Sequence, residues 1–141
     1  MSIYDSQITN ESKRNSRSFK DIDLDFGRNT VTNDVNVVTN IIAIKRAVKN
    51  LVQTNYYERP FHPELGCGVR GLLFENFTPL TAIYLKRKIS EVLNNYEPRI
   101  ELTDVAVDDD QDGNRLVVDI YFTIIGVQGP QQVSTILKRL R

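Results

Sequence analysis

Three consecutive residues, Glu97, Pro98 and Arg99, could form a rigid charged corner at the end of a predicted helix. A guanidinium presents a planar fork of donors that suits carboxylates and backbone carbonyls. A carboxylate and a guanidinium held on either side of a proline could therefore dock a partner helix. The alternative is a solvated turn, because exposed Glu and Arg are common and surface ion pairs contribute only about 0–1 kcal/mol.

Three glutamates, Glu58, Glu64 and Glu75, could supply carboxylates for glycoside hydrolysis. That reaction needs two carboxyl groups roughly 5 or 6.5–9.5 Å apart across a sugar cleft, and nothing in the sequence fixes such a separation. Tryptophan, a common platform for sugar stacking, is absent from the chain. We therefore expect that the protein is not an enzyme, and we keep a peptidoglycan-cleaving, lysozyme-like hydrolase as the alternative function.

His62 and Cys67 could form a nucleophile and base pair or half of a metal site. The chain has only one histidine and one cysteine, so a zinc site would also need two carboxylates in an unusual arrangement. We interpret His62 as a structural loop residue and Cys67 as a buried thiol. No metal and no cofactor are expected.

An acidic segment also imitates a calcium loop of the D-x-D-x-D-G type. Its residues are Asp108, Asp110, Asp112, Gly113 and Asp119. Strand patterns rather than helices flank the segment, and Asp-Gly between two alternating strands is itself a strong signal for a hairpin turn. We therefore expect a plain turn here.

The helix before the corner is predicted over residues 78–97. Thr78 can cap it, Pro79 suits the first helical position, and the helix must end before Pro98. Its apolar positions recur at helical spacing, at Leu85, Ile89, Val92, Leu93 and Tyr96. This stripe predicts a core helix that holds the corner in place.

A second helix is predicted over residues 40–54. Its apolar stripe consists of Ile41, Ile44, Val48, Leu51 and Val52. Basic residues lie off the stripe, at Lys45, Arg46 and Lys49. Because the chain has no net charge and no aromatic platform stands beside these residues, we interpret them as a solvated face rather than a nucleic-acid site.

Alternating apolar residues predict three strand regions. Ile22, Leu24 and Phe26 indicate a strand over residues 19–26, and residues 100–125 read as an antiparallel hairpin. The alternation changes phase between Leu102 and Val105, which predicts a bulge. Between the helices, residues 55–71 form a long loop, with a short helical turn predicted over residues 69–74.

The C-terminal segment can be read in two ways. If it is extended, Val133, Thr135, Leu137 and Arg139 share one face, and if it is helical, that face holds Val133, Ile136, Leu137 and Leu140. The sequence does not decide between a strand and a helix. We expect residues 1–17 to be a flexible arm, residues 18–126 to be one small α+β domain, and residues 127–141 to be an extended tail.

Composition limits the class of protein. The chain has 141 residues with 18 basic and 18 acidic side chains, which suits one domain and gives no global electrostatic reason to bind nucleic acid. The single cysteine excludes an internal disulfide framework. No apolar run approaches the roughly 20 residues of a membrane span, and the N-terminus lacks a signal-peptide pattern. We expect a soluble cytoplasmic protein with no membrane partner.

Three segments together closely resemble a known family. These are RPFHPELGC at 59–67, LFENFTPLTA at 73–82 and NYEPRI at 95–100. They are similar, in the same order, to the small baseplate wedge protein of contractile-tailed T-even-like phages, the gene-product-25 family, which also includes a component of the type VI secretion baseplate. In that family a Glu-Pro-Arg corner is the hallmark, matched here by Glu97, Pro98 and Arg99.

The resemblance implies a structural α+β subunit of the virion tail baseplate, assembled in the host cytoplasm. It implies docking to other baseplate wedge proteins through the corner, with tail tube or hub proteins as further partners. It also implies strand pairing with the tail sheath protein, which would start sheath assembly. We assign that pairing to Val133, Thr135 and Leu137. On this hypothesis Arg99→Ala leaves the isolated fold nearly intact and abolishes wedge assembly.

Overall fold

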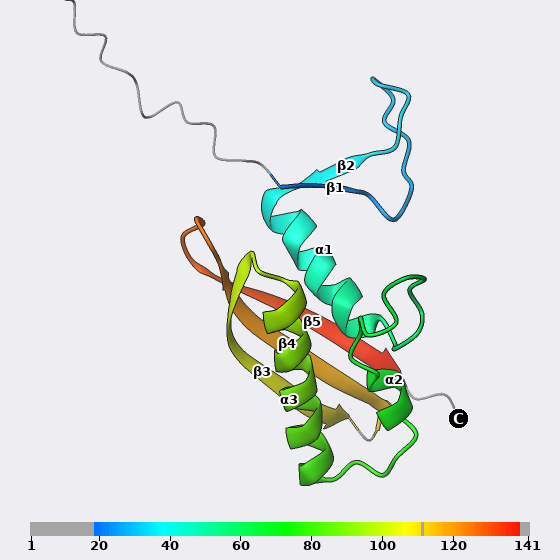
Figure 1. The fold of residues 1–141 in the computed structure, drawn as a ribbon, viewed down its shortest axis with the longest axis vertical. Helices are drawn as coiled ribbons and strands as arrows, with labels where there is room; N and C mark the ends of the chain where they lie inside the picture. The colour runs from blue at the N-terminus through cyan, green and yellow to red at the C-terminus, as the bar shows by residue number, and fades with distance from the viewer. Residues whose placement is uncertain (1–18, 111, 139–141) are drawn as a thin grey trace, which may run out of the picture. The chain divides into compact units, whose positions relative to one another are not determined.

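The computed structural model describes residues 19–110 and 112–138 (Figure 1). The arm expected at residues 1–17 lies outside the described residues. The described chain divides into two compact units, with the boundary between Asn40 and Ile41. It contains helices and antiparallel strands, which confirms the predicted α+β class.

The first unit is a short antiparallel hairpin of β1 (Lys20–Ile22) and β2 (Val37–Thr39). The strand predicted over residues 19–26 is wrong in length, because β1 ends at Ile22. The chain then turns, with the Phe26 N–H donating to the Asp23 carbonyl at 2.9 Å. None of residues 19–40 has a buried side chain. The alternating apolar residues of this segment therefore pack against no core that would keep the strand extended beyond Ile22.

The second unit contains α1 (Asn40–Gln53), α2 (Val69–Leu72) and α3 (Pro79–Tyr96). The start of α3 is as predicted: Pro79 is its first residue, and the Thr78 hydroxyl accepts the Thr81 N–H at 3.2 Å. The predicted stripe of α3 is buried except for Tyr96, which is 36% exposed. Tyr96 was wrongly assigned to the core.

Three antiparallel strands form the sheet in the order β3-β4-β5: β3 (Ile100–Asp110), β4 (Arg115–Ile124) and β5 (Pro130–Lys138). The register of β3 against β4 shifts between Leu102 and Asp104, which confirms the predicted bulge. The C-terminal segment is therefore a strand, paired with β4, and not a helix.

The core lies between this sheet and the helices. Figure 1 shows α1 and α3 on the same face of the sheet. Alternate residues of the central strand β4 point into this layer and are fully or almost fully buried: Leu116, Val118, Ile120, Phe122 and Ile124. Among the described residues, no helix has the length and apolar character that a membrane span requires.

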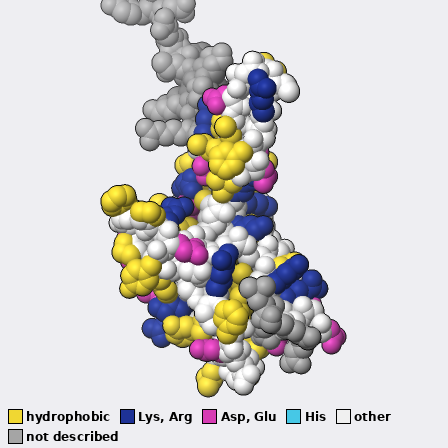
Figure 2. All heavy atoms as spheres, turned by 90° about the vertical axis from the view of Figure 1, so that its right-hand side faces the viewer, with side chains coloured by type: hydrophobic (Ala, Val, Ile, Leu, Met, Phe, Trp, Pro, Cys, Tyr) yellow, Lys and Arg dark blue, Asp and Glu magenta, His cyan; other side chains and the backbone are white. Residues whose placement is uncertain are grey.

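Apolar side chains also remain on the surface. Figure 2 shows several such patches on one face of the molecule, separated by charged residues. Some of the most exposed are Phe61 at 96%, Val31 at 88%, Tyr57 at 84% and Leu80 at 77%. Scattered exposed apolar residues are normal, so a contiguous set is needed before a contact surface is inferred.

Candidate docking sites

Glu97 and Arg99 form a two-pronged ion pair at the end of α3. The Arg99 Nε donates to Glu97 Oε1 at 2.5 Å, and the Arg99 Nη2 donates to Glu97 Oε2 at 2.5 Å. A guanidinium matches a carboxylate in this parallel arrangement, which fixes the orientation of both groups. The predicted charged corner is therefore an internal clamp.

The two charges of the clamp differ in their access to solvent. The Glu97 side chain is 3% exposed, whereas that of Arg99 is 31% exposed. Pro98, between them, is exposed. A partner could therefore reach Pro98 and the outer edge of Arg99. The buried Glu97 carboxylate holds the guanidinium in one orientation.

The backbone holds the corner against both neighbouring elements. The Glu97 N–H caps α3 by donating to the Leu93 carbonyl at 3.0 Å. The Glu97 carbonyl accepts the Ile100 N–H at 3.4 Å across a turn that has Pro98 at its second position, where proline is favoured. The Arg99 carbonyl accepts the Ile125 N–H at 3.0 Å. The corner is thus fixed to α3, to β3 and to the end of β4.

The C-terminal strand places the other predicted contact residues in the core. Val133 is 9% exposed, Thr135 is 0% exposed and Leu137 is 6% exposed. They lie opposite Ile120, Val118 and Leu116 of β4, respectively. Of the two arrangements that the sequence left open, the structure has the extended one, in which the three side chains share a face. That face points inward, so these side chains themselves are covered within the chain.

What β5 offers a partner is its outer edge and its outward face. In the described sheet β5 pairs only with β4, so its other edge has no strand neighbour. An unpaired edge carries backbone donors and acceptors that can template another strand. The outward face carries Gln132, Ser134, Ile136 and Lys138, all exposed. Of these four residues, the sequence pattern singles out only Ile136, and places it on the apolar face of a helix.

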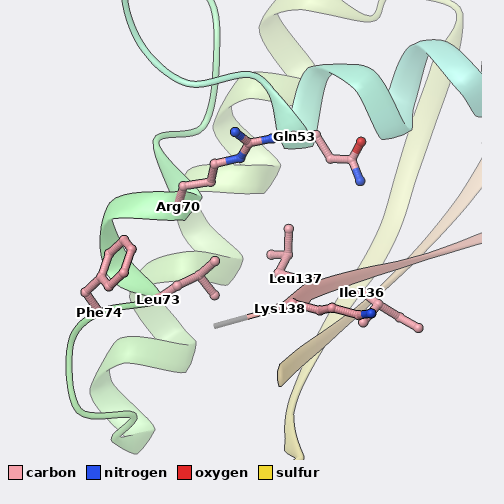
Figure 3. Close-up of a pocket in the computed structure, with 7 residues that line it drawn as sticks. All are labelled: Gln53, Arg70, Leu73, Phe74, Ile136, Leu137 and Lys138. Atoms are coloured by element: carbon pink, nitrogen blue, oxygen red, sulfur yellow. The ribbon is translucent and has the colours of Figure 1, made fainter. Parts of the chain in front are cut away.

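A hollow of about 390 Å³ lies beside the end of β5. It is lined by Gln53, Arg70, Leu73, Phe74, Ile136, Leu137 and Lys138. Figure 3 shows Leu73 and Leu137 pointing toward the gap between α2 and β5, while Arg70 extends toward the end of α1. This hollow could not be predicted from the sequence, because its lining comes from three segments that lie far apart in the chain.

Hydrogen bonds lower the pKa of two of the three glutamates considered for hydrolysis, Glu58 and Glu64. Glu58 Oε2 accepts the Asn55 N–H at 2.9 Å, and this bond lowers the pKa of Glu58. The pKa of Glu64 is also lowered, first by its own backbone N–H and then by His62. A glycosidase acid needs a raised pKa. Hydrogen bonding thus shifts both carboxyl groups in the opposite direction.

Cys67 and Asp110, two other residues considered for chemistry, make contacts that hold the backbone. Cys67 is buried, and its backbone N–H donates to the Thr54 carbonyl at 3.0 Å, closing the loop that begins there. Asp110 Oδ1 accepts the Gly113 N–H at 2.9 Å, and Asp110 Oδ2 accepts the Arg115 Nε–H at 2.6 Å. Both carboxylate oxygens are therefore hydrogen-bonded within the β3–β4 turn. Within the described chain no group of three His, Cys, Asp or Glu residues could hold a metal ion.

Comparison with known sequences places the chain beside baseplate proteins. A family model described as "Baseplate wedge protein gp25" matches residues 40–128. The match starts at Asn40, one residue before the second compact unit. The baseplate wedge protein gp25 of Enterobacteria phage T4 is 37% identical over 107 residues, which cover 76% of this chain and 80% of that protein.

Solved structures have the same fold at lower sequence identity. A chain in the baseplate of the anti-feeding prophage matches with a TM-score of 0.68 and 22% identity, covering 79% of this chain and 89% of that one. A Geobacter sulfurreducens protein, named as a suspected tail lysozyme, matches with a TM-score of 0.63 and 23% identity, covering 70% of this chain and 89% of that one. A chain of the postcontracted pyocin R2 baseplate matches with a TM-score of 0.56 and 20% identity, covering 73% of this chain and 98% of that one.

Proposed function

The chain belongs to the family of the baseplate wedge protein gp25, and from this membership we propose that it docks its neighbours in a tail baseplate through the corner Glu97-Pro98-Arg99. Its role in the baseplate is structural. One observation carries the docking proposal: a buried carboxylate holds a partly exposed guanidinium with two hydrogen bonds at the end of a core helix.

The clamp suits docking because it is preorganised. A free arginine loses side-chain rotamer freedom when it binds, at a cost of about 0.5–1.5 kcal/mol for each immobilised side chain. Glu97 already restricts Arg99 before any partner arrives. The exposed third of Arg99, together with Pro98, then offers a fixed surface to the carbonyls or carboxylates of another chain.

The partners that we propose for the corner are other baseplate wedge proteins. Tail tube or hub proteins are further candidates. In this proposal the subunit works in the tail baseplate of the virion after assembly in the host cytoplasm, and needs no cofactor, nucleic acid or membrane.

A second contact is proposed at the outer edge of β5, for a strand of the tail sheath protein. Since Val133, Thr135 and Leu137 face the core, the pairing would use the backbone of β5 rather than these side chains. Added strands gain affinity from main-chain hydrogen bonds and specificity from pockets for side chains. The hollow beside Leu137 could supply such a pocket.

The corner is tested by wedge assembly with the other wedge proteins of the same phage. Arg99→Lys keeps the charge but loses the planar fork, so we expect a folded protein whose retention in a pull-down falls at least tenfold. Arg59→Lys is the matched control, because Arg59 is an exposed loop residue. Normal assembly of a folded Arg99→Lys or Arg99→Ala protein would refute docking through the corner.

The hydrolase alternative has a separate test. Pure protein is assayed for cell-wall turnover beside Glu58→Gln, Glu64→Gln and Glu75→Gln. We expect no turnover by the unmodified chain. Turnover that is lost in one of these variants would establish catalysis and overturn a purely structural role.

A further inference from the structure

α3 carries a second stripe on its exposed side, in addition to the stripe that packs in the core. Leu80 is 77% exposed, Ile83 is 64% exposed and Tyr84 is 49% exposed. With the exposed Arg87 they follow the spacing i, i+3, i+4 and i+7, so the four residues lie on one side of the helix. We call these four residues the outer stripe.

Hollows lie on both sides of the outer stripe. One, of about 400 Å³, is lined by Leu72, Glu75, Leu80, Thr81 and Tyr84. The other, of about 230 Å³, is lined by Ala82, Ile83, Lys86, Val105 and Val107. The outer stripe is therefore a ridge with a groove on each side. Helices pack against each other by placing the side-chain ridges of one into the grooves of the other.

Arg87 ends the outer stripe with a charge available for a partner. Its neighbours on α3 are paired: Lys86 with Asp104 at 2.5 Å and Lys88 with Glu91 at 3.3 Å. Throughout the described chain, by contrast, the Arg87 side chain has no hydrogen bond or ion pair. A complementary surface would therefore place a carboxylate there.

We propose that the outer stripe binds an amphipathic helix of a neighbouring baseplate subunit. The bound helix presents apolar side chains at i, i+3 and i+4 to the two grooves and an Asp or Glu to Arg87. This inference rests on the proposed structural role. It adds a contact near the start of α3, whereas the Glu97-Pro98-Arg99 corner follows the end of the same helix.

The size of the surface favours this occupant over a second copy of the chain. Three partly exposed apolar side chains present on the order of a few hundred Å². A stable free dimer usually buries about 800 Å² on each partner. The outer stripe alone is too small for that. It suits a helix that other contacts of the same assembly already hold nearby, because linked contacts multiply in their effect.

Photo-crosslinking in the reconstituted wedge tests the inference. A benzophenone amino acid replaces Leu80 or Ile83, with Gln128 as the control position, since it is exposed outside the outer stripe. Cross-links from positions 80 and 83 to one helical segment of another subunit are the expected result. Cross-links only to a second copy of this chain, only to an extended segment, or to nothing in an assembled wedge would overturn the inference.

Charge reversal gives an independent test of the Arg87 contact. Arg87→Glu should reduce wedge incorporation about tenfold, and reversing the acidic residue found by cross-linking should restore it. Arg59→Glu is the matched charge reversal and should have no such effect. Equal incorporation of Arg87→Glu and the unmodified chain would overturn the contact. If the unmodified chain does not assemble with wedge proteins at all, the proposed function itself fails as well.

Discussion

Lys86 on α3 and Asp104 on β3 form an ion pair, with 2.5 Å between Nζ and Oδ1. Asp104 stands directly after the register shift that begins at Leu102. A bulge changes the direction of the side chains that follow it. Here Asp104, just after the bulge, pairs with Lys86 of α3. The pair therefore joins α3, which bears the outer stripe and leads into the corner, to β3, an edge strand of the sheet.

The pair predicts a pH dependence of stability. The Lys86 hydrogen bond, followed by the Val105 N–H, lowers the pKa of Asp104 below its ordinary value of 3.8. Because the folded-state pKa is the lower one, the stabilisation is present above the unfolded-state pKa and is lost as the pH falls through the folded-state value. Lys86→Met should raise the pKa of Asp104, as measured by NMR titration. An unchanged titration would show that the pair does not persist in solution.

Arg99→Ala should destabilise the isolated protein, contrary to the expectation from sequence that the fold stays nearly intact. It leaves the Glu97 carboxylate buried without its arginine. We expect a loss of roughly 1–3 kcal/mol in the free energy of unfolding, less than for a fully buried pair because Arg99 is partly solvated. Glu97→Gln combined with Arg99→Ala should recover part of that loss in urea denaturation. A single variant as stable as the unmodified chain would contradict the buried clamp.

Thr135→Val should stabilise the protein. The Thr135 Oγ1 is buried and has no hydrogen-bond partner among the described residues. Valine has nearly the same shape and removes the cost of burying an unpaired hydroxyl, so we expect a gain of about 1–2 kcal/mol. Thermal unfolding measures it, with the exposed Thr103→Val as a control that should stay within about 0.5 kcal/mol. A loss of stability would mean that the hydroxyl is paired.

Gly66→Ala should destabilise the protein by roughly 2–3 kcal/mol. Gly66 has a φ of +137°, and an added Cβ would lie 2.5 Å from the Thr54 carbonyl oxygen. Gly71→Ala in α2 is the matched control, because its Cβ would meet nothing within 4 Å. The control should be neutral or stabilising by about 0.5–1 kcal/mol. Equal melting temperatures for the two variants would contradict the closed loop.

Cys67 should resist thiol reagents in the folded protein. Burial raises the pKa of its thiol to about 12, so almost no thiolate exists near neutral pH. Labelling with a chromogenic disulfide reagent should follow unfolding and become fast only in denaturant. Rapid labelling of the native protein at pH 7 would show that the loop closed by Cys67 and Thr54 opens readily.

Most of the second unit could be predicted from sequence because independent signals agreed. For α3, the cap at Thr78, the proline at Pro79 and the apolar spacing all indicate the same helix. For β4, strict alternation marks a half-buried strand, and the change of phase after Leu102 marks the bulge. Local chemistry decides these features, so one sequence is enough to find them.

The orientation of the site residues could not be predicted in the same way. Residue types indicate that Glu97 and Arg99 can pair, but burial of Glu97 depends on α3 and the sheet closing around it. The alternation around Thr135 separates the two faces of β5 without showing which one is inside. The outer stripe was not predicted, because one sequence does not show which of two apolar sides of α3, that of Leu80 or that of Leu85, packs in the core.

The hairpin of residues 19–40 has no buried side chain. Truncating one of these side chains therefore leaves no cavity of the kind that follows a large-to-small change in a core. The segment is instead held by backbone hydrogen bonds, such as that from the Asn36 N–H to the Gly27 carbonyl at 2.9 Å. Its form therefore depends on local turn chemistry, whereas the form of the second unit depends on a packed core.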